Sequence, residues 1–162
     1  MSTRTWLLNN FDTQVTGSIM ALPDLPLTIP AGGKLVRFQV RSTFTTGWLT
    51  GTQASQVAAF YLSQRVHFTS GAYSPRDIFK SSRGIPMAPV AVNPSGSLTD
   101  YYDCWFWGGD NEFGVDQRCS YGGPSKPAMG LTYTSFIATE DSRFTGTGNF
   151  RMATTFAALY ES

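Results

Sequence analysis

Apolar residues recur at every second position over two long stretches of this chain, and this alternation constrains the fold more than any other feature. The segment Leu35–Phe44 places Val36, Phe38 and Val40 on one face and polar or charged residues on the other. The segment Ala58–Ser70 repeats the pattern, with an expected inward set of Phe60, Leu62, Val66 and Phe68. A period of two indicates β-strands with one buried face.

Three further segments, Leu98–Trp107, Met129–Thr139 and Asn149–Tyr160, are rich in β-branched and aromatic residues and are also expected to be strands. We therefore predict an all-β fold, a β-sandwich or jelly roll with long irregular loops, in one domain over residues 1–162. Residues 1–33 should form an extended segment of that domain, because prolines fix the backbone there. These are Pro23, Pro26 and Pro30.

The stretch from Gly71 to Gly96 carries weaker signals. Pro75 could begin a short helical turn through Lys80, and three more prolines follow before Gly96. We expect irregular surface structure in this part of the chain.

Charged residues make up only 14% of the chain, against a usual value of about 25%, and the net charge is +1. A surface with so few charges favours partial burial by neighbouring molecules, although low-charge extracellular β domains share this composition. The basic residues are scattered singly, so we expect no nucleic-acid partner. The chain lacks a run of about 18 apolar residues, and Met1–Asp12 lacks a signal-peptide core, so we expect neither membrane insertion nor export from this N-terminus.

The residues show no recognisable catalytic constellation. His67 is the single histidine, which excludes a multi-histidine zinc site and leaves any Ser-His-Asp scheme dependent on one strand residue. The chain has no G-x-S-x-G elbow and no phosphate-binding loop motif. We predict a protein that is not an enzyme and needs no cofactor.

An acidic cluster between positions 100 and 116 is the densest polar feature. It consists of Asp100, Asp103, Asp110, Glu112 and Asp116. Three interpretations stay open: a solvated loop, which we favour, a Ca²⁺ site whose spacing departs from the EF-hand pattern, and a pair of glycosidase carboxylates.

Cys104 and Cys119 flank the same loop. A disulfide between them would close a loop of about 15 residues and contribute about 3 kcal/mol in the chain-entropy model. Two buried thiols are the default for a chain without an export signal, whereas a protein that works outside the cell should contain the disulfide.

Aromatic residues reach their highest density in the same region, from Tyr101 to Trp107. Alternate members should fill the core, and the outward members could stack on a sugar ring or a partner subunit. The candidate interaction surface comprises Tyr101, Trp105, Trp107, Asp110, Glu112 and Tyr121.

Three stretches, Arg4–Trp6, Leu25–Leu35 and Gly148–Arg151, resemble virion proteins of tailed bacteriophages, in particular small minor tail proteins. The likeness is one of style and extends over most of the chain. It implies a β-rich protein that is made without a signal peptide, assembled in the host cytoplasm and multimeric in the virion. It transfers no catalytic residue to this sequence.

We therefore expect a structural component of a bacteriophage particle, a minor tail protein that binds copies of itself and other virion proteins. The alternative is a β-sandwich module that recognises a carbohydrate or a host receptor, with the Trp105–Tyr121 region contacting a host-surface glycan.

Overall fold

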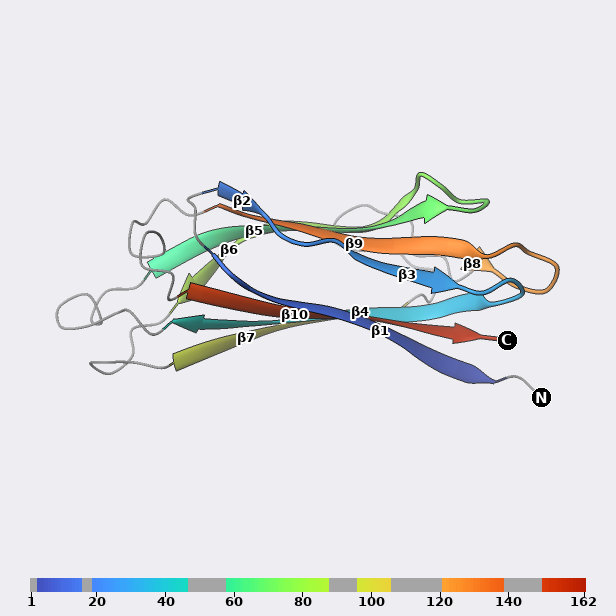
Figure 1. Ribbon diagram of the computed structural model, residues 1–162, viewed down its shortest axis with the longest axis horizontal. Helices are drawn as coiled ribbons and strands as arrows, with labels where there is room; N and C mark the ends of the chain where they lie inside the picture. The colour runs from blue at the N-terminus through green and yellow to red at the C-terminus, as the bar shows by residue number, and fades with distance from the viewer. Residues whose placement is uncertain (1–2, 16–18, 47–57, 88–95, 106–120, 139–149) are drawn as a thin grey trace.

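The computed structural model describes residues 3–15, 19–46, 58–87, 96–105, 121–138 and 150–162, and these form ten strands without a helix. The strands are β1 (Arg4–Gln14), β2 (Ile19–Ala21), β3 (Leu25–Ile29), β4 (Lys34–Thr46), β5 (Ala58–Ser70), β6 (Asp77–Met87), β7 (Gly96–Trp105), β8 (Tyr121–Gly122), β9 (Met129–Ala138) and β10 (Phe150–Glu161). They build two antiparallel sheets that face each other as the layers of a sandwich (Figure 1).

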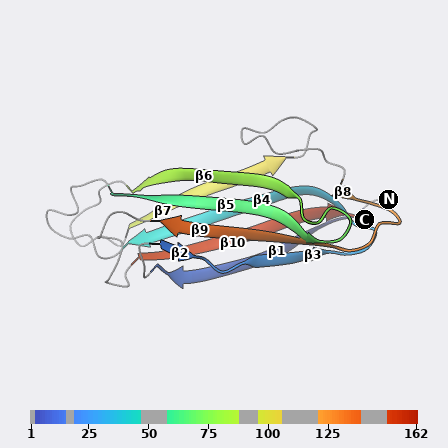
Figure 2. The same cartoon turned by 90° about the horizontal axis from the view of Figure 1, so that it is seen from above.

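The topology of the two sheets is that of a jelly roll. The first sheet has the order β1-β10-β4-β7, with β8 added to β4, and the second has the order β2-β9-β5-β6, with β3 added to β9. β2 and β3 both pair with β9 and can be counted as one interrupted strand. Each connection along the chain then crosses from one sheet to the other, with two exceptions: the β5–β6 hairpin and the connection from β7 to β8 stay within one sheet. Two interlocked Greek keys of eight strands have this connectivity. Seen from above, strands of the two sheets run in nearly the same direction (Figure 2). The expected all-β sandwich is therefore confirmed.

The inward face of β4 departs from strict alternation at one residue. Phe38 and Val40 are buried as predicted, but Leu35 is buried in place of Val36, which is half-exposed. The cause is a β-bulge, because β10 pairs Leu159 with Arg37 and Tyr160 with Leu35 and leaves Val36 without a partner in the register. The prediction for Val36 is wrong because the bulge moves the period of two by one residue.

The region expected to be irregular after Gly71 instead contains β6, which pairs with β5 along its length. Among the described strands β6 is at the edge of its sheet, where the missing N–H of Pro86 is tolerated. The described part of the N-terminal segment 1–33 includes the short strands β2 and β3. It also contains the regular strand β1, paired with β10 from Arg4 to Gln14, which the sequence analysis does not anticipate.

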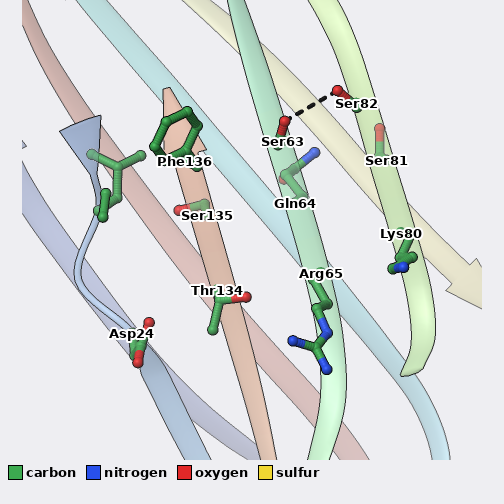
Figure 3. A pocket seen from close by; sticks show the side chains of 12 residues that line it. Asp24, Ser63, Gln64, Arg65, Lys80, Ser81, Ser82, Thr134, Ser135 and Phe136 are labelled. Atoms are coloured by element: carbon green, nitrogen blue, oxygen red, sulfur yellow. Dashed lines mark hydrogen bonds between the residues drawn. The ribbon is translucent and has the colours of Figure 1, made fainter. Parts of the chain in front are cut away.

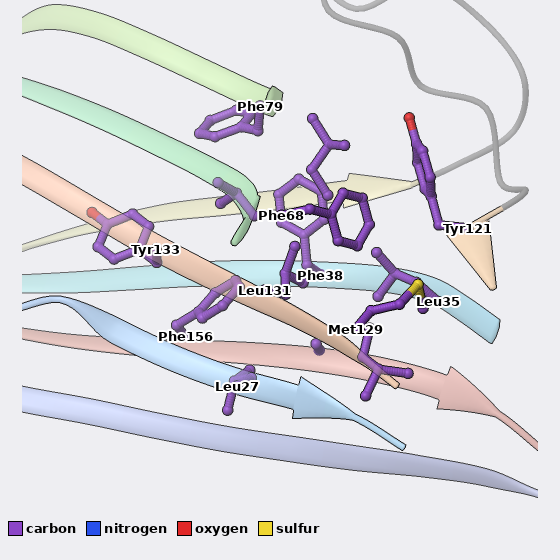
Figure 4. Close-up of a cluster of buried hydrophobic side chains, with 14 of the residues drawn as sticks. Leu27, Leu35, Phe38, Phe68, Phe79, Tyr121, Met129, Leu131, Tyr133 and Phe156 are labelled. Carbon is purple, nitrogen blue, oxygen red and sulfur yellow. The ribbon is translucent and has the colours of Figure 1, made fainter. Parts of the chain in front are cut away.

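Aromatic side chains form the centre of the core. Phe38 contacts Phe79 and Phe156 edge-on, with ring centroids 5.8 and 6.5 Å apart, and Tyr133 lies 5.8 Å from Phe156. We call these four residues the aromatic layer (Figure 4). Such pairs contribute about 0.5–1.5 kcal/mol each beyond the free energy of burial.

A layer of polar side chains lies beside the aromatic layer. In the second sheet Gln64 is paired in register with Ser81 and Ser135, and in the first sheet Ser42 is paired with Thr154. All five are at most 7% exposed. By register, both groups lie nearer than the aromatic layer to the end of β4 and the start of β5. These two strand ends lie at the same end of the sandwich (Figure 1). We call these five residues the polar layer.

Candidate functional site

The structure places only part of the predicted interaction surface. Tyr101 and Trp105 lie in β7, where the register pairs them with Arg41 and Arg37 of β4. Cys104 pairs in register with Phe38, and Asp100 and Asp103 pair with Ser42 and Gln39. Four residues of the predictions, Trp107, Asp110, Glu112 and Cys119, lie outside the described residues, as does Asp116. The disulfide and the calcium interpretation therefore stay predictions.

Tyr121 does not belong to an interaction surface, which corrects the sequence prediction. It is 2% exposed, and its ring lies 5.0 Å from that of Phe68 and 5.1 Å from that of Tyr73. The guanidinium carbon of Arg76 lies 5.9 Å from the ring centroid. The short strand β8 pairs with β4 and holds Tyr121 over the end of the core, so that the side chain packs inward.

The β1–β10 pair presents an apolar strip on the outer face of the first sheet. Trp6 and Leu8 are 43% and 67% exposed, and they pair in register with Leu159 and Ala157, which are buried beneath their neighbours. The guanidinium carbon of Arg37 lies 5.5 Å from the Trp6 ring centroid, within range of a cation–π interaction. We call Trp6, Leu8, Ala157 and Leu159 the β1–β10 strip.

Ion pairs border this strip at both ends. Arg4 lies 3.8 Å from Glu161, and Arg151 lies 3.1 Å from Asp12, each measured between side-chain nitrogen and oxygen. The strip is thus an apolar centre between charged rims, an arrangement found in protein–protein interfaces. Since β1 is the edge strand of its sheet in the described part of the chain, its backbone could also pair with another strand.

A groove of about 680 Å³ lies on the outer face of the second sheet (Figure 3). Strands β9, β5 and β6 form its floor, and the chain between β2 and β3 forms one wall with Leu22 and Asp24. The exposed or half-exposed side chains that line it are Asp24, Ser63, Arg65, Lys80, Ser82, Thr134 and Phe136. We call this feature the outer groove.

Charged groups gather at one end of the outer groove. Arg65 donates a hydrogen bond from its Nε to Asp77, and the Nζ atom of Lys80 lies 3.5 Å from the same carboxylate. Burial alone would raise the pKa of Asp77, but the hydrogen bond and positive charge of Arg65, together with Lys80, hold that pKa below its ordinary value. Asp77 is therefore an anion at neutral pH.

His67 lies one outward position along β5 from Arg65. Burial and the nearby positive charge of Arg65 lower the pKa of His67, and Asp77 and Asp24 oppose this in part. Its imidazole is therefore neutral at pH 7. Among the described residues no group of three His, Cys, Asp or Glu side chains is placed to hold a metal ion.

Sequence reasoning missed the residues of both surfaces. Trp6 and Leu8 alternate with half-buried residues along β1, but the sequence does not show this period, because Trp6, Leu7 and Leu8 are three consecutive apolar residues. Phe136 and the serines of the outer groove come from different strands, so only the sheet register brings them together.

No protein-family model matches the chain, and no curated protein sequence matches it. Solved structures of infectious bursal disease virus are similar in part. The Gx strain structure aligns with 98% of this chain and 32% of that chain at 7% identity and a TM-score of 0.41. The VP2 subviral particle of the same virus aligns over 99% and 41%, at 9% identity and a TM-score of 0.29.

This chain therefore spans 32% to 41% of the length of those proteins. At such identities and TM-scores the similarity carries no conclusion about function. In the part of the chain that the structure describes, there is no helix long and apolar enough to cross a membrane.

Proposed function

We propose that this chain is a structural, non-enzymatic subunit of a virus particle, and more specifically a minor tail protein of a bacteriophage. It would associate with copies of itself and with other tail proteins in the virion, after assembly in the host cytoplasm. The bacteriophage assignment follows the resemblance in Arg4–Trp6, Leu25–Leu35 and Gly148–Arg151. The jelly roll is compatible with this role, since viral capsid domains use it, but lectins and cupins use it too.

The β1–β10 strip is the observation that carries the proposal. Trp6 and Leu8 are exposed on a long edge strand, in a chain with only 14% charged residues. Apolar surface on a strand edge favours association, and closed symmetry covers it without open-ended aggregation. Burial of the strip between copies, with pairing of β1 edges, is the proposed mechanism of assembly.

Light scattering coupled to size-exclusion chromatography tests this mechanism. The full chain should elute as a closed oligomer, and Leu8→Asp should convert it to monomer because a charge would enter the apolar centre of the interface. Asn10→Asp is the matched control, since Asn10 is an exposed residue of the same face of β1 and should leave the oligomer intact. A wild-type chain that stays monomeric at high concentration and does not co-sediment with virion proteins of the same particle would contradict the proposal.

A further inference from the structure

The outer groove has an aromatic end. Phe136 is 39% exposed and lines the groove. Tyr61, 58% exposed, is on the same face of the sheet, because β5 pairs Ser63 with Phe136 and Tyr61 with Ala138. The Tyr61 ring lies near Gly84 of β6, so Phe136 is the aromatic side chain that lines the groove.

Hydroxyl groups cover the middle of the groove. The Oγ atoms of Ser63 and Ser82 are 3.1 Å apart across β5 and β6, and either can donate to the other (Figure 3). Thr134 adds a third hydroxyl from β9. Each of these groups can both donate and accept a hydrogen bond, so the floor suits a ligand that itself carries hydroxyl groups.

The far end of the groove is charged but balanced. Arg65 and Lys80 share the carboxylate of Asp77, and Asp24 stands on the opposite wall. Two cations and two anions cancel, so the groove offers no net charge to a phosphate-rich or sulfated ligand. The fixed charged groups can still form directional hydrogen bonds with neutral hydroxyls.

From this sequence of surfaces we infer that the outer groove is a binding site for a short neutral oligosaccharide. A pyranose ring has an apolar C–H face that packs on an aromatic ring and a rim of hydroxyls that need polar partners. One ring would pack against Phe136, the next would lie over Ser63, Ser82 and Thr134, and the far hydroxyls would reach Asp24 and Arg65. The groove volume of about 680 Å³ lies within the usual range of about 300–1,000 Å³ for ligand sites.

The floor of this site and the β1–β10 strip face opposite sides of the sandwich. The outer groove lies on the second sheet, and the β1–β10 strip lies on the outer face of the first sheet. A subunit whose β1–β10 strip is covered in an oligomer would therefore still present the floor of the groove, whereas the Leu22–Asp24 wall lies on the same edge of the sandwich as β1, where Asn9 donates a hydrogen bond to the Pro26 carbonyl of β3. Sugar binding would give a particle protein a means of contacting a glycan-covered surface.

The test is binding of the full chain to an array of neutral hexose and N-acetylhexosamine oligosaccharides, with sialylated and sulfated glycans on the same array. The array should show selective binding to one or more neutral oligosaccharides. Calorimetric titration with the best neutral array ligand should then give saturable binding. Phe136→Ala and Ser82→Val should each weaken it by tenfold or more, because one removes the packing surface and the other removes a hydroxyl partner.

Asn10→Asp is the control, because it changes an exposed residue of the opposite sheet outside the β1–β10 strip and should leave the titration unchanged. Thermal unfolding of each variant shows whether the fold is intact. Absence of saturable binding to any neutral glycan would overturn the inference, as would unchanged affinity in folded Phe136→Ala and Ser82→Val. Salt-sensitive binding to sialylated or sulfated glycans alone would also overturn it and would indicate an anion site at Arg65 and Lys80. Each of these outcomes is separate from the oligomeric state, which tests the proposed function.

Discussion

The aromatic layer and the polar layer lie side by side between the same two sheets, but their buried side chains differ in how completely they find partners. In the aromatic layer every ring packs against another ring, and Phe38 and Phe156 are at most 1% exposed. In the polar layer the hydrogen bonds are incomplete. Ser42 and Thr154 bond each other at 3.0 Å, and Tyr133 donates to the Oε1 atom of Gln64 at 2.7 Å.

Three buried atoms of the polar layer have no hydrogen-bond partner in the described part of the chain. They are Gln64 Nε2, Ser81 Oγ and Ser135 Oγ. An unsatisfied buried polar group costs about 1–3 kcal/mol, so the polar layer does not hold the sandwich together. It does oppose slippage of the strands, because a shift of two residues would set polar side chains against the rings of the aromatic layer. The aromatic layer therefore contributes stability, and the polar layer favours the observed strand register.

The largest expected effect comes from the aromatic layer. Phe38→Ala should lower the free energy of unfolding by about 3–5 kcal/mol, because it removes a ring that contacts both Phe79 and Phe156. Gln39→Ala, at the next residue and on the outer face, should cost less than about 1 kcal/mol. Chemical denaturation of both variants measures the difference. Equal costs would mean that the aromatic layer is no more important than the sheet surface.

A smaller effect should come from the hydrogen bond that joins the two layers. Tyr133→Phe should cost about 1–2 kcal/mol, because it leaves the Oε1 atom of Gln64 without its donor. Gln64→Leu alone should also be destabilising, since it orphans the Tyr133 hydroxyl. The double variant should be more stable than the sum of the two single effects allows, and strict additivity in the denaturation data would argue against coupling.

The pH dependence of stability tests the environment of His67, which lies on the outer face of the second sheet. The folded pKa of His67 lies below its ordinary value of 6.5, mainly because of burial and the charge of Arg65. The unfolded chain therefore binds a proton more readily, and the free energy of unfolding should fall as pH drops from 6.5 through the folded pKa. Denaturation at about pH 7.5 and about pH 5.5 should show this loss, and His67→Gln should reduce it. A slope that His67→Gln leaves unchanged would assign the effect to another group.

The smallest expected change distinguishes paired from unpaired hydroxyls within the polar layer. Ser135→Ala should leave stability within about 0.5 kcal/mol of the wild type or raise it, because Ser135 Oγ has no partner among the described residues. Ser42→Ala should cost about 1 kcal/mol, because it leaves the hydroxyl of Thr154 without its bond. The melting temperature of Ser135→Ala should therefore be higher than that of Ser42→Ala. The reverse order would mean that Ser135 is hydrogen-bonded in solution.

The strands with strong alternation could be predicted from the sequence, because each such pattern reports burial of its own face. Leu62, Val66 and Phe68 are buried as the sequence predicts. The predictions of buried and exposed residues were wrong where burial depends on a residue that is distant in the sequence. The bulge at Val36 depends on pairing with β10, and burial of Tyr121 depends on Phe68 and Tyr73.

The outer groove could not be predicted from any one segment. Its hydroxyls belong to Ser63, Ser82 and Thr134, residue types that are common on every exposed strand face. Only the pairing of β5 with both β6 and β9 brings them together, and the sequence of a single strand does not predict which strands will pair with it.

The position of β10 has a consequence for how the chain folds during synthesis. β10 is the last of the described strands in chain order, yet it lies between β1 and β4, which it joins along their lengths. The first sheet therefore cannot close until translation of the described strands has ended, and contacts between residues so distant in sequence form slowly. Until then β1 and β4 present open edges on which other nascent chains can pair. Expression at lower temperature or at slower initiation should accordingly raise the fraction of chain that folds without aggregating.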